Sequence, residues 1–322
     1  MKRLILLLCI TNFLFMHQLH ASKSVWDGRS SDTSWYDENL LEYYINSAAQ
    51  FRGFADLVSY NNCSFEGKTI YLNCDIDLDN HAWSPIGLHS GKPFSGIFDG
   101  LNHSIINLLI NSNQLEYPDM KDNVGLFGYA PKAEIRNFSI QGRLEIYNGK
   151  YIGGVAAFVN RIENIYSDIK IRINDNKSAS IIGCVVGSGT VISRIYSIGE
   201  ITCANGMLFD QVYIGGIAGN GKTVSECFSS VDISIKRVGT YSTRTGGISG
   251  SSSLLSDVIF IGSISEQNIN CNSDQFIPFT GGICGSFGGD GKNIISAPRF
   301  MSFGRGWASG KRFLRQHQES DA

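Results

Sequence analysis

The chain has 322 residues, of which 36 are glycine and six are proline, and only 17% are charged. This composition is too apolar for a disordered protein and is typical of a protein built from strands and turns. Its 27 lysines and arginines against 29 aspartates and glutamates give no basic stripe, which argues against nucleic acid as a partner.

Residues 1–21 have the pattern of a secretory signal peptide. An apolar run follows Lys2 and Arg3 and ends at Met16, and an imperfect cleavage site ends at Ala21. The run is too short to span a bilayer comfortably, and no longer apolar run follows it. We therefore expect a secreted or cell-surface protein with no transmembrane segment in the mature chain.

The segment from Ile45 to Ser59 is the clearest helix in the sequence. Five apolar residues recur in it at helical spacing, and Asn46 or Ser47 is placed to cap its start. The five residues are Ala48, Phe51, Phe54, Ala55 and Val58.

Three aspartates alternate with apolar residues in the sequence CDIDLD at 74–79. In a strand, this alternation places Asp75, Asp77 and Asp79 on one face. Close carboxylates of this kind bind calcium or serve as acid and base in enzymes that act on polysaccharides. The other interpretation is the solvated outer face of a strand, and we prefer it, because the sequence does not show which basic side chain would lie nearby.

From residue 124 onward, a glycine-containing element occurs six times. Its copies begin 28 to 35 residues apart, at Val124, Ile152, Ile182, Ile214, Thr245 and Thr280. An element of the form apolar-x-x-apolar follows each of the first five copies, for example Ile162 to Ile165. An alternating strand comes next, as in Ile169, Ile171 and Ile173.

Each repeat is therefore about three short strands, none of which can bury its apolar face alone. Stacking the copies at the spacing of strands in a sheet, about 4.8 Å, builds one continuous core. The sequence predicts an all-β parallel β-helix (a β-solenoid) with about 28–35 residues per coil, right-handed like most such connections. The helix at 45–59 would cap the N-terminal end. The glycines are expected at sharp turns, where they tolerate unusual backbone angles and close approach of the next coil.

The G-G-I-x-G and V-G-L-F-G copies resemble the GLUG-motif repeats of secreted and surface-attached bacterial proteins. The upstream stretches FEGKTIYLNCDIDLDNHAWSPIG and FSGIFDGLNHSIINLLI resemble the usual entry to such arrays. This resemblance covers roughly residues 24–296 and implies a parallel β-helix in a family whose members are mostly adhesin-like or without an assigned role. It divides the mature chain into an N-terminal cap with first coils (22–123), a GLUG-type solenoid (124–296) and a tail (297–322) that we expect to be poorly ordered or truncated.

Aromatic residues lie in the polar connections between the repeats, at 204–213, 236–244 and 265–279. Variable connections of a solenoid often lie on one face and are often used for binding, and aromatic side chains there suit a sugar or a protein. The other interpretation is that they fold back over the core. The candidate ligand-binding residues are Phe209, Tyr213, Tyr241, Phe276 and Phe279.

The remaining polar residues form no motif for a cofactor or a metal. His81, His89 and His103 are too scattered for metal-ligand spacing, and no phosphate-binding loop or catalytic nucleophile motif occurs. The cysteines include no C-x-x-C pair. We expect Cys203 and Cys227 to be buried free thiols, and Cys63 with Cys74 is the only pair we consider for a disulfide.

These patterns together predict a secreted or cell-surface β-solenoid that serves as an adhesin-like binding module for a glycan or an extracellular protein, without catalysis. One alternative is a polysaccharide lyase or hydrolase of the β-helix type that uses Asp75 and Asp77. A second alternative is a structural spacer within a surface protein.

Overall fold

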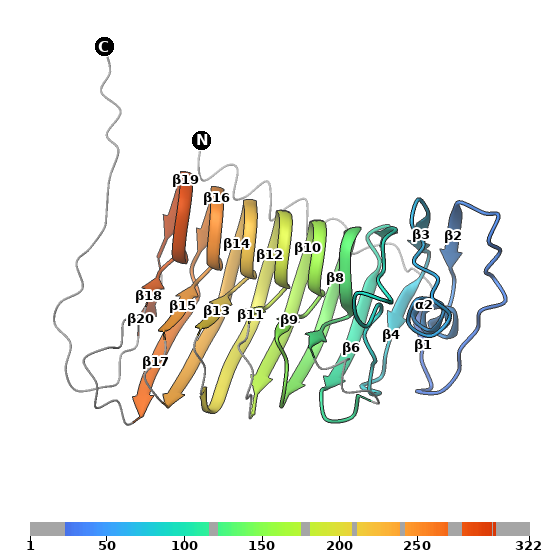
Figure 1. The fold of residues 1–322 in the computed structure, drawn as a ribbon, viewed down its shortest axis with the longest axis horizontal. Coiled ribbons are helices and arrows are strands. Elements are labelled where there is room, and N and C mark those ends of the chain that lie inside the picture. The colour runs from blue at the N-terminus through green and yellow to red at the C-terminus, as the bar shows by residue number, and fades with distance from the viewer. Residues whose placement is uncertain are drawn as a thin grey trace, which may run out of the picture.

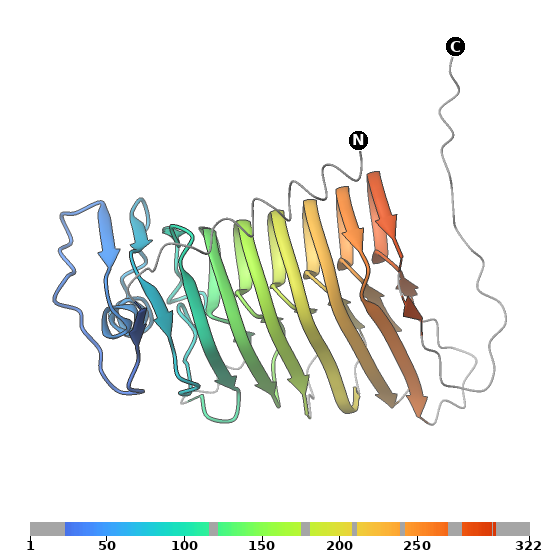
Figure 2. The ribbon, with the colours of Figure 1, turned by 180° about the vertical axis from the view of Figure 1, so that it is seen from behind.

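The computed structural model describes residues 23–115, 122–174, 181–207, 211–238, 242–269, 279–297 and 299–300. Parallel strands stack side by side along one long axis, and the single helix of this part of the chain lies at the N-terminal end (Figures 1 and 2). The protein is thus a β-solenoid, as the repeats predict.

The first coils are irregular and precede the repeats. Strands β2, β3 and β5 pair in one line and β1, β4 and β6 in another, and both lines continue into β8. The elements are β1 (Lys23–Val25), β2 (Glu42–Ile45), α2 (Ala48–Ser59), β3 (Thr69–Leu72), β4 (Asp75–Asp77), β5 (Ile97–Asp99) and β6 (Ser104–Asn111).

Each later coil combines a short strand with a longer one, and the glycine element lies between them. The short strands form one sheet: β7 (Asn123–Val124), β9 (Tyr151–Gly153), β11 (Ile181–Gly183), β13 (Gln211–Gly215), β15 (Ser242–Gly246) and β18 (Phe279–Gly281). The longer strands form the other: β8 (Phe127–Ile146), β10 (Ala156–Ile173), β12 (Val186–Met207), β14 (Ala218–Val238), β16 (Ser249–Phe260) with β17 (Ser263–Ile269), and β19 (Cys284–Ser296) with β20 (Arg299–Phe300).

Alternating residues of the longer strands build the core in register. Ile171 pairs with Leu144 of the preceding coil and with Ile201 of the next, which in turn pairs with Ile233. All four side chains are buried, whereas the neighbouring Lys170 is exposed. The predicted inward and outward positions of these strands are therefore confirmed.

A left-handed residue divides each longer strand into two arms. It is the third residue of the apolar-x-x-apolar element, and its φ lies between 51° and 61° in every repeat. These corner residues are Asn137, Asn164, Arg194, Glu226, Asp257 and Asn293. The corner at Asn293 shows that the sixth repeat also contains this element, from Gly291 to Ile294. The sequence did not reveal it, because Gly291 stands where the other copies have an apolar residue.

The glycines between the strands are needed for close approach of the coils. A Cβ on Gly153 would lie 2.2 Å from the Ala156 carbonyl oxygen, and one on Gly154 would lie 2.5 Å from the Cys184 carbonyl oxygen. Neither glycine has a positive φ. The expectation of close packing is therefore confirmed, but that of unusual backbone angles is wrong at these positions.

Helix α2 covers the apolar end of the first coils. It begins at Ala48 rather than Ile45, which ends β2, and the side-chain oxygen of the N-cap Ser47 accepts a hydrogen bond from the Gln50 amide. Phe51 and Phe54 are fully buried, and Phe54 meets a cluster of phenylalanine rings at the end of the solenoid. The helix is the predicted N-terminal cap.

All cysteines that the structure describes are free thiols, including Cys63 and Cys74. Cys203 lies in the buried column between Ile173 and Ile235, as expected for a thiol that acts as a small apolar side chain. Burial raises the pKa of Cys227 to about 12.

We predict that Ile171→Asp lowers the free energy of unfolding by about 3–5 kcal/mol, because it places an unpaired charge between apolar coils. Lys170→Asp should change it by no more than about 0.5 kcal/mol, since this side chain faces solvent. Chemical denaturation of the two variants checks this, and equal stabilities would contradict the register.

We also predict that iodoacetamide at pH 8 leaves Cys184, Cys203 and Cys227 unmodified in the folded protein. These thiols are buried, and burial raises the pKa of Cys184 to about 12, so the reactive thiolate is scarce. The partly exposed Cys63 should react first, and denaturant should expose all four. Mass spectrometry checks this, and a disulfide at Cys203 or Cys227 would contradict it.

Candidate functional site

The predicted binding residues lie partly in strands. Tyr213 belongs to β13, and Phe279 begins β18, so the connections are shorter than the sequence suggests. Arg244 stands between these two residues in the stack, and its guanidinium carbon lies 4.9 Å from the centre of the Tyr213 ring. Phe209, Tyr241 and Phe276 lie outside the described residues, as does the side chain of Phe279.

A row of aromatic side chains crosses several coils on the same face. The Phe158 ring centre lies 5.1 Å from that of Tyr151 and 5.7 Å from that of Tyr129, and each ring is half-buried. In the stack of short strands, Ile181 pairs with Tyr151 of the preceding coil and with Tyr213 of the next coil. We call Tyr129, Tyr151, Phe158, Ile181 and Tyr213 the aromatic row.

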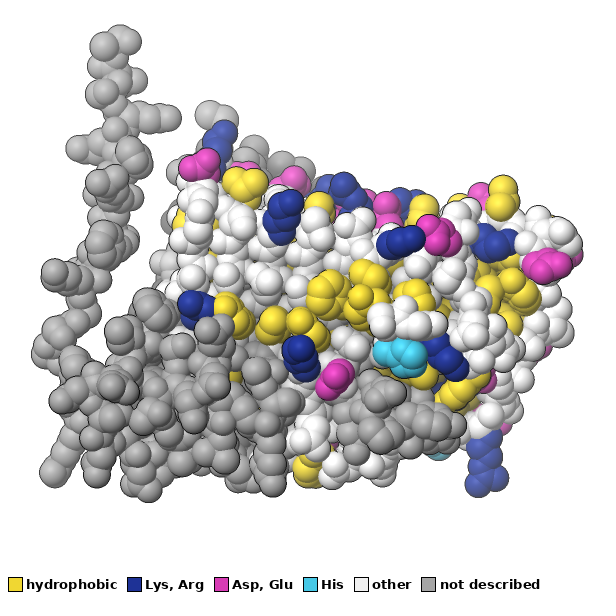
Figure 3. Space-filling model, in the orientation of Figure 1, with side chains coloured by type: hydrophobic (Ala, Val, Ile, Leu, Met, Phe, Trp, Pro, Cys, Tyr) yellow, Lys and Arg dark blue, Asp and Glu magenta, His cyan; other side chains and the backbone are white. Residues whose placement is uncertain are grey.

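A band of hydrophobic side chains lies over β9, β11 and β13, the strands that contain Tyr151, Ile181 and Tyr213 (Figure 3). Basic groups border the row: Lys150 has its Nζ 5.6 Å from the Tyr151 ring centre, and Arg244 covers Tyr213. The sequence prediction named Tyr213 and did not include Tyr129, Tyr151 and Phe158. The available signal for Tyr151 was its position directly before the glycine element, which Ile181 and Tyr213 share.

Half-buried tyrosine and phenylalanine rings combine apolar area with a polar edge and lose little side-chain freedom on contact. Cations beside them supply hydrogen-bond donors for an oxygen-rich partner. The aromatic row can therefore contact either the apolar faces of sugar rings or a protein surface.

The aspartates at 75–79 are used in local contacts and do not share one solvated face. Asp77 is 6% exposed, pairs with Lys23 Nζ at 2.7 Å, and accepts hydrogen bonds from Asn107 Nδ2 and the Asp79 amide. Asp75 Oδ1 lies 3.1 Å from His103 Nδ1. Asp79 has a φ of 48° beyond the end of β4, so the predicted alternation stops before it.

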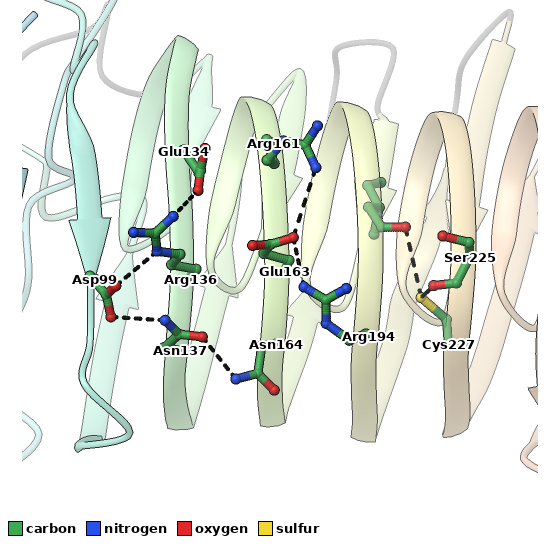
Figure 4. A network of polar contacts seen from close by, with 11 residues as sticks. Asp99, Glu134, Arg136, Asn137, Arg161, Glu163, Asn164, Arg194, Ser225 and Cys227 are labelled. Atoms are coloured by element: carbon green, nitrogen blue, oxygen red, sulfur yellow. Dashed lines mark hydrogen bonds and ion pairs between the residues drawn. The ribbon is translucent and has the colours of Figure 1, made fainter. Parts of the chain in front are cut away.

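Asp99 is bound in the same way one coil further along. Its carboxylate accepts hydrogen bonds from Arg136 Nε at 2.8 Å, from Asn137 Nδ2 at 3.0 Å and from the Leu101 amide at 3.0 Å. Arg136 also contacts Glu134, so that one guanidinium joins two carboxylates (Figure 4).

The charges continue outward along the next coils. Glu163 pairs with Arg194 at 2.8 Å and lies 3.8 Å from Arg161 of its own strand (Figure 4). From coil to coil, Asp99, Arg136, Glu163 and Arg194 alternate in sign. Alternating charges at successive coils avoid like-charge contacts and favour this register of the sheet.

The two buried carboxylates, Asp77 and Asp99, remain ionised at neutral pH. Burial raises the pKa of Asp99, but the hydrogen bonds from Arg136 and Asn137 outweigh it, so the pKa lies below its usual value. The same balance holds for Asp77, where Lys23 and Asn107 outweigh burial and lower the pKa. A general acid must hold a proton near the operating pH, and neither group is arranged to do so.

Within the described ranges, no three side chains of histidine, cysteine, aspartate or glutamate are grouped to hold a metal ion. The His81 and Trp26 rings meet edge to face with their centres 5.9 Å apart. His89 Nδ1 accepts a hydrogen bond from the Gly91 amide. The described part of the chain contains no helix of the length and apolarity that crossing a membrane requires.

Comparison of the chain with protein-family models, with curated proteins and with solved structures finds no match in any of the three.

We predict that Asp99→Asn lowers the free energy of unfolding at pH 7 by about 1–3 kcal/mol, because it removes the charge that Arg136 pairs with. A carboxyl whose pKa is lowered by folding stabilises the fold above its unfolded pKa, near 4, and loses this contribution as the pH falls through the folded value. The difference between wild type and variant should therefore shrink as the pH falls from 5 to about 2.

Denaturation at each pH measures this difference. Asp290→Asn, which changes an exposed aspartate of β19, is the control and should differ little from wild type throughout. A difference for Asp99→Asn that stays constant down to pH 2 would contradict the assignment of a lowered pKa.

Proposed function

We propose that this β-solenoid is an adhesin-like binding module that is secreted or displayed at the cell surface and holds a glycan or an extracellular protein along the aromatic row. The observation that carries the proposal is the row itself. Its half-buried rings come from three of four consecutive coils, with Ile181 in the coil between Tyr151 and Tyr213. Lys150 and Arg244 lie beside them.

The direction of the row favours an extended partner. Tyr151, Ile181 and Tyr213 occupy equivalent positions of consecutive coils, so the row follows the long axis of the solenoid. A glycan chain or an extended peptide laid along it touches several coils at once. Weak contacts made in this way add through effective concentration, and no single deep pocket is required.

Export of the protein rests on the signal peptide predicted for residues 1–21. The buried thiols are compatible with an oxidising environment, because burial withholds Cys184 and Cys227 from exchange. The resemblance of the repeats to GLUG motifs supports the same assignment to the cell exterior.

The proposal includes the absence of catalysis. Asp75 and Asp77, the residues that a polysaccharide lyase or hydrolase would use, have their oxygens engaged by His103, Asn107 and Lys23. These contacts fit a role in joining neighbouring coils, and they do not favour the enzyme alternative.

We predict that a glycan and host-matrix array probed with the full chain identifies a partner whose binding to Phe158→Ser is at least about tenfold weaker, because truncating a central aromatic contact costs about 2 kcal/mol. Shortening the chain between β12 and β13 (208–210) and between β17 and β18 (270–278) should also weaken binding.

The matched control is Tyr196→Ser. Tyr196 is a half-buried ring stacked between Tyr166 and Phe228 on the other arm, away from the aromatic row. Equal losses for Phe158→Ser and Tyr196→Ser would contradict the proposed surface. Turnover of a polysaccharide that is lost in Asp77→Asn would replace the proposal with the enzyme alternative.

A further inference from the structure

A cavity of about 310 Å³ opens at the N-terminal end of the solenoid, apart from the aromatic row. It lies between the turn after β1, helix α2, the segment after β4 and the end of β6. The aromatic and polar side chains that define it are Trp26, Arg29, Arg52, Asp56, Trp83 and Gln114.

The wall of this cavity is rigidly packed. The Trp83 ring stacks on the Phe51 ring with the ring centres 5.1 Å apart, and the Trp26 and Trp83 rings meet edge to face with their centres 5.5 Å apart. The Arg52 guanidinium carbon lies 5.7 Å and 5.8 Å from the two indole rings, and its NH2 group is 2.8 Å from Asp56 Oδ1. Trp26, Trp83 and Arg52 are therefore held in place before any ligand arrives.

Polar groups of the cavity remain without partners. Trp83 is fully buried and its indole N–H makes no hydrogen bond, whereas the Trp26 indole donates to the Ser30 carbonyl at 3.0 Å. Leaving a buried donor unpaired is costly, so an oxygen atom of a ligand would be stabilised there. Arg29 and Gln114 line the cavity with exposed side chains, which have no hydrogen-bond or ion-pair partner in the described part of the chain and are therefore available to a ligand.

These groups define the chemistry of a ligand. Arg29 and Arg52 against Asp56 leave a net positive charge, which favours an anion. The Gln114 amide oxygen also accepts hydrogen bonds, and a hydroxyl group can donate to it, whereas a fully ionised inorganic anion cannot. The volume lies at the lower limit of small-molecule sites, about 300 Å³, which suits a single sugar unit.

We propose that this cavity binds a sugar unit that carries a carboxylate, such as a uronic acid. The carboxylate pairs with the Arg29 guanidinium, and ring hydroxyls meet the Trp83 indole N–H and the Gln114 amide. The unit is either a free sugar acid or the terminal residue of a glycan.

Titration of the full chain with sodium glucuronate, followed by tryptophan fluorescence and calorimetry, tests the proposal. We expect saturable binding, little binding of glucose, and affinity that falls with added salt. Arg29→Gln removes a charge-assisted hydrogen bond from an exposed side chain and should weaken binding by about tenfold or more. Trp83→Phe keeps an aromatic ring at this position and removes the N–H, and calorimetry should show weaker binding.

The matched control is Arg172→Gln, which removes an exposed arginine far along the solenoid and should bind glucuronate as wild type does. Methyl glucuronide separates the two sources: equal binding identifies the terminal unit of a glycan, and binding of glucuronate alone identifies the free acid. The absence of saturable glucuronate binding, or an unchanged affinity in Arg29→Gln, would overturn the proposal.

Discussion

Successive coils pair equivalent residues over most of each longer strand, with register shifts at a few bulges, and this constraint decides which residue each position accepts. Inside, it places Leu144, Ile171 and Ile201 in one buried column. Outside, it stacks the rings of Tyr196 and Phe228 with their centres 4.5 Å apart. Between the strands, it brings backbones so close that a side chain does not fit, which explains the glycines better than their backbone angles do.

The same constraint explains how a left-handed corner is tolerated in every coil. Non-glycine residues reach this conformation at a cost, which is lowest for asparagine and aspartate. Stacking offsets the cost where the amide of Asn164 donates to Asn137, and that of Asn137 donates to Asp99. At Arg194 the corner side chain pairs with Glu163 instead. Corner residues therefore take part in the polar contacts between coils, both around Asp99 and in the Glu163–Arg194 pair.

Local patterns predicted the coil but not the contacts between distant segments. The repeat spacing, the alternation around Ile171 and the cap at Ser47 depend on neighbouring residues, and each was visible in the sequence. The function of Asp77 depends on Lys23 and Asn107, which come from two other coils, so its pattern alone indicated an exposed face. Tyr213 was placed in a loop because its surroundings are polar, although pairing with the adjacent coils extends the strand through it.

The irregular N-terminal coils differ from the repeats in what they can hold. Where every coil repeats the last, each outward side chain has similar neighbours on both sides, so the surface forms continuous stripes that suit long partners. A hollow needs elements that break the repeat. Helix α2 and the turn after β1 do so, because they must cover the apolar end of the core, and in doing so they surround Trp83 without satisfying its N–H. The cap that the core requires therefore also forms the polar cavity at the N-terminal end.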